Sequence, residues 1–149
     1  GTLIMAEPAW YSDNVVYHMG IDPMTKRQGI YKTNLENDST EKVISDACEM
    51  KISPNRDYIA YRDFSGTLRN CVYQIETGLI TPVEGSYGMC DVVWNSPTEF
   101  ALVRDGQVMS ANVEGKILDE HSIDVMSGNY LAAASIDELK RERAQCKVE

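Results

Sequence analysis

The sequence has few of the features that carry enzyme chemistry or span membranes. It contains only two histidines and no Gly-x-Ser-x-Gly, His-Glu-x-x-His, Walker A or Gly-x-Gly-x-x-Gly motif. The usual signatures of serine hydrolases, zinc peptidases and nucleotide-binding enzymes are therefore absent. No run approaches the roughly 18 consecutive apolar residues that a membrane-spanning helix needs. Five prolines and ten glycines among 149 residues also exclude collagen-like and low-complexity chains.

Basic residues are scarce as well, since 14 Lys and Arg stand against 23 Asp and Glu, a formal net charge of −9. Nucleic-acid affinity comes largely from cations that neutralise phosphates, so nucleic acid is an unfavourable partner. Apolar residues make up 43% of the chain, which is enough for the core of one ordinary domain. The composition favours a folded domain whose partner is a protein with a basic or polar surface, without insertion into a membrane.

The four cysteines, Cys48, Cys71, Cys90 and Cys146, include no Cys-x-x-Cys pair. One interpretation is that they are small buried side chains, because free cysteine is often buried. The other is one disulfide in an oxidising compartment, whose pairing the sequence does not assign. The cysteines therefore leave the compartment open.

What the sequence does contain is an internal repeat with a period of 42 residues. This spacing separates Trp10, Ile52 and Trp94, and it recurs in Cys48 and Cys90, Tyr31 and Tyr73, Tyr58 and Phe100, and Arg62-Asp63 and Arg104-Asp105. Each unit has four short apolar or alternating runs separated by polar turns, which is typical of a four-stranded antiparallel meander. The expected strands are 9–10, 15–19, 29–34 and 42–45, then 48–52, 58–62, 70–75 and 79–83, then 91–94, 99–104, 107–113 and 116–119.

Four-stranded units with a period of about 40–45 residues are the signature of β-propeller blades. Residues 52–61 and 72–78 resemble the TolB-type propeller repeat, in which Ser-Pro-Asp-Gly precedes an apolar strand and a later strand ends near Thr-Gly. This sequence departs from the family at Arg56, where the repeat has Gly. The resemblance implies an all-β propeller, and by analogy alone it suggests the bacterial periplasm. The alternative is a β-sandwich with chance internal similarity, which short even strands also suit.

The repeat predicts a propeller segment over residues 1–134, with about three four-stranded blades and a partial fourth at 122–125 and 130–134. Residues 135–149 are expected to form a short C-terminal helix on the surface, or a frayed tail, because Ser135 and Glu138 have the spacing of a capping box. Closed propellers have four to eight blades. We therefore expect a second copy or another chain to complete the ring. A longer propeller and a small four-bladed ring are the alternatives.

These features predict a non-enzymatic protein-interaction scaffold without cofactor or metal. The candidate binding residues are acidic residues expected in loops: Glu36, Asp38, Glu84, Asp119 and Glu120. Loops on a rigid sheet scaffold suit binding, and carboxylates favour a basic partner. One alternative is the gating propeller segment of a prolyl-oligopeptidase-type serine peptidase. Another is a propeller that binds a small ligand through aromatic residues in pockets between blades.

Several other residues have simple structural interpretations. We expect His18 to lie in a strand and His121 in an acidic turn, with no third group that would make either catalytic. Trp10 and Trp94 follow the repeat, so we expect both to pack between blades. The repeated Arg62-Asp63 and Arg104-Asp105 pairs are interpreted as ion pairs or turn hydrogen bonds at strand ends.

Overall fold

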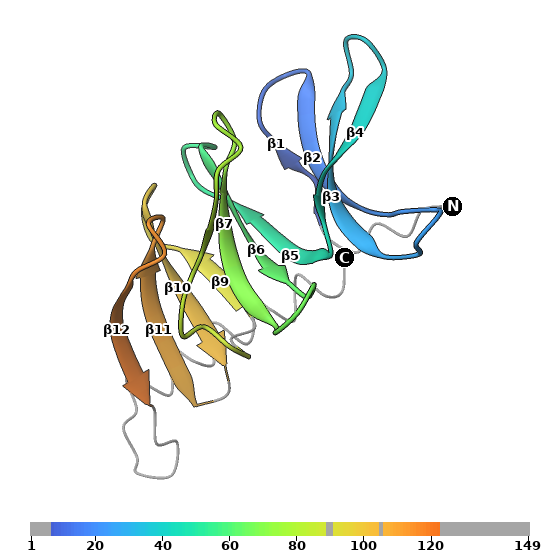
Figure 1. Cartoon of the computed structure of the whole chain (residues 1–149). Coiled ribbons are helices and arrows are strands. Elements are labelled where there is room, and N and C mark those ends of the chain that lie inside the picture. The colour runs from blue at the N-terminus through green and yellow to red at the C-terminus, as the bar shows by residue number, and fades with distance from the viewer. Residues whose placement is uncertain (1–6, 89–90, 105, 123–149) are drawn as a thin grey trace.

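The computed structural model describes residues 7–88, 91–104 and 106–122, which form twelve strands in three antiparallel sheets (Figure 1). The first sheet comprises β1 (Ala9–Trp10), β2 (Val15–Ile21), β3 (Gln28–Asn34) and β4 (Ser39–Ser45). The second comprises β5 (Ala47–Ile52), β6 (Tyr58–Asp63), β7 (Arg69–Gln74) and β8 (Ile80–Pro82). The third comprises β9 (Asp91–Trp94), β10 (Glu99–Arg104), β11 (Gln107–Asn112) and β12 (Ile117–Ser122). The predicted all-β fold with three four-stranded units is confirmed. Among the described residues there is no helix long and apolar enough to cross a membrane.

The main difference from the sequence prediction is the length of β12. It pairs with β11 as far as the partners Gln107 and Ser122, so Asp119, Glu120 and His121 lie in a strand and not in a turn. Pairing with the whole of β11 gives the backbone N–H and C=O groups of this acidic segment hydrogen-bond partners in the sheet, and polar side chains alone do not provide these partners. Ser122, where the expected fourth unit begins, is the last residue of β12. The rest of that unit and the expected C-terminal helix at 135–149 lie outside the described residues.

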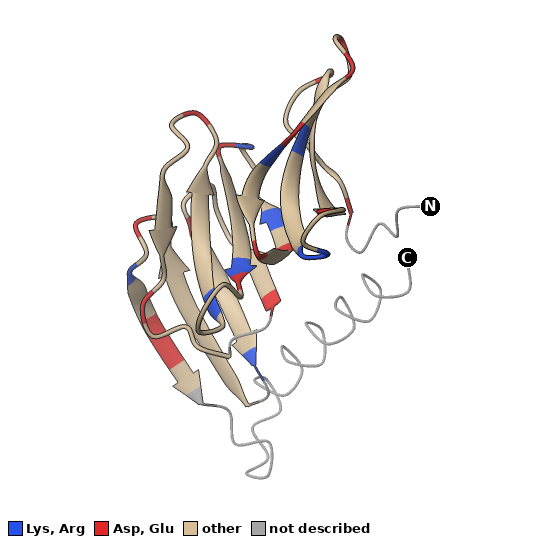
Figure 2. Cartoon of the chain, turned by 45° about the vertical axis from the view of Figure 1, so that its right-hand side comes forward, with Lys and Arg blue, Asp and Glu red and all other residues tan. Residues whose placement is uncertain are grey.

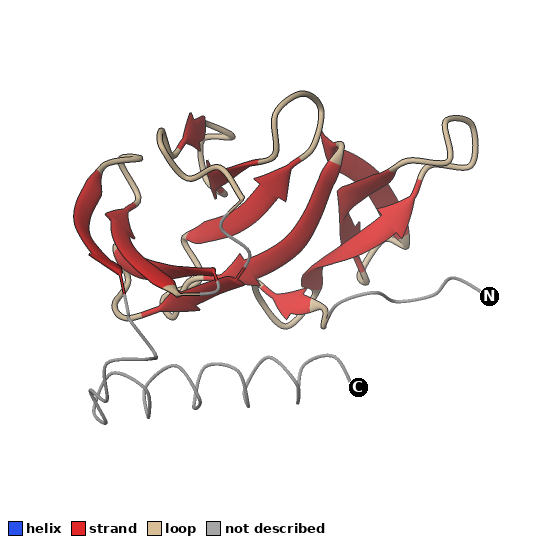
Figure 3. Ribbon diagram, turned by 90° about the horizontal axis from the view of Figure 1, so that it is seen from below, coloured by secondary structure: helices blue, strands red, loops and turns tan. Residues whose placement is uncertain are grey.

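The three sheets stand side by side and fan out from one another, as the view from below shows (Figure 3). An apolar core fills each of the two spaces between neighbouring sheets. In β6, Ile59 and Tyr61 enter the core shared with the first sheet, while Ala60 enters the core shared with the third. Successive strand residues point to opposite faces, so the second sheet is covered on both sides.

The first and third sheets each have an outer face that no other described sheet covers. In β2, Tyr17 and Met19 enter the first core, so the alternating residues face outward. In β10, Phe100 and Leu102 enter the second core, so the residues between them also face outward. These two outer faces lie at opposite ends of the row of sheets (Figure 1).

The 42-residue repeat holds for the first strand of each sheet but not for the second. Trp10 is paired with Val16, Ile52 with Ile59, and Trp94 with Phe100. The turn after β5 is one residue longer than the corresponding turns, and Arg56 adopts a φ of 64° in it, where the TolB-type repeat has Gly. The extra residue moves the second strand by one position.

Candidate protein-binding surfaces

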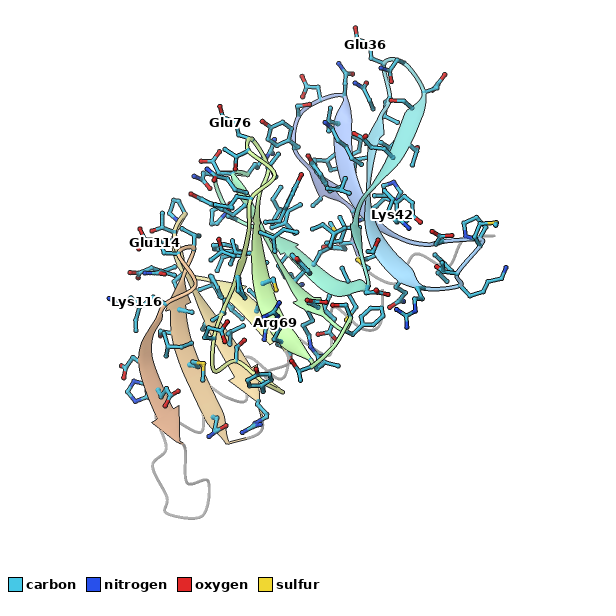
Figure 4. All side chains as sticks on the ribbon, viewed as in Figure 1. Glu36, Lys42, Arg69, Glu76, Glu114 and Lys116 are labelled. Carbon is cyan, nitrogen blue, oxygen red and sulfur yellow. The ribbon has the colours of Figure 1, made fainter. Side chains whose placement is uncertain are left out.

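Six turns lie together at one end of the sheets, which we call the hairpin end. They connect the first strand to the second and the third to the fourth in every sheet, at residues 11–14, 35–38, 53–57, 75–79, 95–98 and 113–116. Glu36, Glu76 and Glu114 mark three of these turns in Figure 4. The sheets therefore bring together short loops that are far apart in the sequence.

The hairpin end carries mostly negative charge (Figure 2). Its turns contain six carboxylates, Asp13, Glu36, Asp38, Asp57, Glu76 and Glu114, and two cations, Arg56 and Lys116. Within residues 7–122 as described, none of these six carboxylates forms a salt bridge. Their charge is therefore available to an incoming cation.

Several carboxylates toward the opposite end instead form ion pairs with Lys or Arg. Asp22 lies 2.6 Å from the Lys42 ammonium, and Asp46 lies 2.9 Å from the Arg27 guanidinium. The hydrogen bond from Lys42, followed by those from the backbone N–H groups of Met24 and Thr25, lowers the pKa of Asp22 to about 2.

The second sheet adds further ion pairs at its strand ends. Arg62 lies 3.2 Å from Glu49, and Asp63 lies 3.7 Å from Arg69. The interpretation as strand-end contacts is thus confirmed for Arg62-Asp63, whereas Asp105 of the second pair lies outside the described residues. In the third sheet, Arg104 donates hydrogen bonds to the Gln107 side chain and to the backbone carbonyl of Tyr87.

The structure does not bring the five predicted binding residues onto one surface. Glu36 and Asp38 lie together in the turn between β3 and β4 at the hairpin end. Glu84 follows β8 at the other end, 4.0 Å from Arg69. Asp119 and Glu120 lie in β12, so their assignment to a loop is corrected.

Sequence reasoning missed four other carboxylates of the hairpin end: Asp13, Asp57, Glu76 and Glu114. The signal that identifies them is topological. In an antiparallel meander, the turn after the first strand and the turn after the third strand lie at the same end of the sheet. Acidic residues in those two turns of each repeat unit therefore share one end.

A groove of about 460 Å³ lies between the second and third sheets near the hairpin end. Tyr58 and Gln74 contribute to its wall from the second sheet, and Thr98 and Val113 from the third. Gly115, at a φ of 81°, packs so closely on the Pro82 carbonyl that any side chain there would collide with it. The half-buried Tyr58 is the one aromatic residue that lines this groove.

His18, Cys48 and Cys71 have structural surroundings, whereas His121 is exposed in β12, with its Nε2 2.7 Å from the Asp119 carboxylate. His18 Nε2 lies 2.8 Å from the Thr33 hydroxyl, and its ring stacks on Tyr31, as in an ordinary strand histidine. Cys48 and Cys71 are free thiols. Burial raises the pKa of both, which disfavours the reactive thiolate.

Cys90 and Cys146 lie outside the described residues. Among the residues with described positions, no three His, Cys, Asp or Glu side chains are grouped as metal ligands.

The two tryptophans of the repeat have different surroundings. The Trp94 indole N–H donates a 3.1 Å hydrogen bond to the Lys51 carbonyl of the second sheet, and its ring lies 5.0 Å from Phe100. Trp94 therefore packs between sheets, as predicted. Trp10 has the corresponding register but is 46% exposed. No described sheet lies beyond it, so the prediction for Trp10 is not met within the described part of the chain.

Comparison with known proteins supports this architecture. No family model matches the chain, and no curated protein matches it. The solved acylaminoacyl peptidase of Pyrococcus horikoshii is similar over 85% of this chain and 26% of its own, with 17% identity and a TM-score of 0.63. The β-propeller domain of the trilobed protease from Pyrococcus furiosus, which has an open velcro topology, is similar over 81% and 43%, with 18% identity and a TM-score of 0.65. TolB from Acinetobacter baumannii is similar over 80% and 32%, with 14% identity and a TM-score of 0.57.

These similarities define the class of protein: the three sheets are blades of a β-propeller. The chain spans less than half the length of each of these solved structures. At identities below 20% the likeness concerns the fold alone.

Proposed function

We propose that this chain is a non-catalytic protein-interaction scaffold whose β-propeller is completed by a second copy or by another chain. The observation that carries the proposal is the contrast between the two ends of the sheets. Asp22, Asp46, Glu49, Asp63 and Glu84, away from the hairpin end, are paired with Lys or Arg, whereas the six carboxylates at the hairpin end have no such partner among the described residues. Turns held by a rigid sheet scaffold are well suited to binding.

The charge of the hairpin end favours a partner with a basic surface. Six carboxylates in neighbouring turns attract Lys and Arg side chains and repel phosphates. Because these groups are exposed, salt screens their interaction over a distance of about 10 Å at 0.1 M ionic strength. The proposed contact is therefore sensitive to salt.

A lysine-rich decapeptide titrated into the protein by calorimetry tests this proposal. We expect affinity to fall by about tenfold between about 0.05 and 0.5 M salt, because exposed ion pairs are screened. Neutralising Glu36 and Asp38 together (Glu36→Gln, Asp38→Asn) lowers the affinity at low salt. Glu84→Gln is the matched control at the opposite end and leaves the affinity nearly unchanged. An affinity that is independent of salt, or equally reduced by Glu84→Gln, contradicts the proposal.

A second candidate function follows from the peptidases among the similar structures. Their likeness to this chain supports a propeller segment that accompanies a separate hydrolase domain. This interpretation rests on the fold alone. A hydrolase domain with a serine-nucleophile motif in the same parent gene would favour it over the independent scaffold.

A further inference from the structure

The contact between the second and third sheets follows a simple rule of size. On the second sheet, the small Ala60 of β6 and its neighbour Val72 of β7 face the third sheet. The third sheet places larger residues in this core, including Phe100 and Leu102. Trp94 adds its hydrogen bond to the Lys51 carbonyl, and Lys51 is paired with Ala60 in the second sheet. Large side chains of the third sheet therefore pack against a face of the second sheet that carries the small Ala60 and Val72 beside the half-buried Tyr58.

The outer face of the first sheet carries the tryptophan half of this arrangement, with Val16 at the position of Phe100. Trp10 is paired with Val16, as Trp94 is paired with Phe100. His18 follows Val16 by two residues, as Leu102 follows Phe100, so the three positions share the outer face. Trp10 is 46% exposed there, and its N–H has no described partner. This face therefore has the register of a sheet-to-sheet contact, but no described sheet packs against it.

The outer face of the third sheet carries the small half. Ala101 of β10 has the register of Ala60, and its neighbour Ser110 of β11 has the register of Val72. Val93 is paired with Ala101, as Lys51 is paired with Ala60. Ala101, Ser110 and Val93 are each only half-buried. The Val93 carbonyl therefore corresponds in register to the Lys51 carbonyl, which accepts the Trp94 hydrogen bond.

We propose that a second copy of this chain docks head-to-tail, with the outer face of its first sheet against the outer face of the third. In this contact the Trp10 indole N–H of one copy donates to the Val93 carbonyl of the other. The proposed contact repeats the interface between the second and third sheets. It rests on the proposed function, because it names the chain that completes the propeller. Two such contacts join two copies into a ring of six blades, within the range of closed propellers.

Both faces of the proposed contact carry polar groups. His18, which has the position of Leu102, is hydrogen-bonded to the Thr33 hydroxyl, and Thr33 lies 2.8 Å from the Thr40 hydroxyl. The opposing face has Ser110 where the internal contact has Val72. Both faces are thus more polar than their internal counterparts, which suits faces that separate copies expose to water before they assemble.

Light scattering coupled to size-exclusion chromatography tests the proposal on the whole chain over a range of concentrations. We expect the wild type to be dimeric. Trp10→Arg removes the tryptophan face and Ala101→Arg obstructs the small one, so each variant alone is monomeric. An equimolar mixture of the two restores a dimer, because one intact tryptophan face then meets one intact small face. Trp10→Phe keeps the ring but loses the N–H in both contacts of the dimer, and it weakens the dimer by about 25-fold, which is about fivefold for each contact.

Circular dichroism establishes that the variants are folded, and Ser110→Arg replaces Ala101→Arg if the latter does not fold. Met24→Ala, at a side chain 89% exposed on the first sheet, is the control that leaves the dimer intact. A monomeric wild type overturns the proposal, as does a mixture that stays monomeric or a dimer that neither Arg variant disturbs. A monomer that still binds the lysine-rich peptide with salt dependence refutes this docking mode alone.

Discussion

The two cores between the sheets are built in different ways. The first contains the tyrosines Tyr17, Tyr61 and Tyr73, and the rings of Tyr17 and Tyr73 lie 6.5 Å apart. The second is mainly aliphatic around Phe100, is joined by the Trp94 hydrogen bond, and leaves the groove near the hairpin end.

The second sheet causes this difference, because its two faces carry residues of different size. Ile59 and Tyr61 fill space on one side, whereas Ala60 leaves space for the third sheet on the other. One four-stranded sheet can therefore support two distinct modes of packing, since alternate residues of a strand serve opposite faces.

The largest expected effect is at Phe100, which is fully buried at the centre of the second core. Phe100→Ala should destabilise the protein by about 3–5 kcal/mol, because it removes apolar contacts and leaves a cavity. Urea unfolding measures the loss. Hydrogen exchange should show reduced protection in the third sheet before the first. A loss below about 1 kcal/mol would show that the second core collapses around the change.

A smaller effect is expected from the Trp94 hydrogen bond. Trp94→Phe keeps an aromatic ring beside Phe100 but removes the donor to the Lys51 carbonyl, which should cost about 1 kcal/mol. Trp10→Phe is the matched control, and at a dilution where copies are separate it should change stability by less than about 0.5 kcal/mol. Equal losses of stability in both variants would contradict the inference that a neighbouring sheet covers Trp94 but not Trp10.

The smallest effect is an alkaline sensitivity confined to the first core. Burial, with a smaller contribution from Tyr73, raises the pKa of Tyr17 to about 12, and burial also raises the pKa of Tyr61 and Tyr73. A raised tyrosine pKa stabilises the fold fully below about pH 10, and this stability is lost as the pH rises toward 12. The urea midpoint should fall between pH 8.5 and about 10.5, and fall less in Tyr17→Phe. The same fall in both proteins would exclude Tyr17 as its source.

The sequence predicts the three units and nearly all their strands, because apolar alternation and turn residues are local signals. It fails where one residue changes the register. Tyr58 and Phe100 are 42 residues apart, yet Phe100 corresponds to Ile59, since the turn after β5 has an additional residue. A fixed period therefore assigns Tyr58 to the wrong face of its sheet.

The candidate surface was predicted less well than the fold. Glu36 and Asp38 were predicted only to lie in a loop, and the structure places that loop at the hairpin end, whereas Glu84 lies at the other end, beside Arg69. Asp119 and Glu120 belong to β12, because pairing with β11 continues through an acidic segment. Which carboxylates share a surface depends on the direction of each strand, and which are neutralised depends on long-range ion pairs. Neither is a local property of the sequence.

The one-sided pairing of carboxylates has a consequence for how a partner arrives. Under the proposed function, the unpaired carboxylates of the hairpin end attract a cationic protein before any atoms touch, so more of its collisions begin in a productive orientation. In the same proposal, the ion pairs around Arg27, Lys42 and Arg69 weaken the attraction of such a partner to the opposite end of the described sheets.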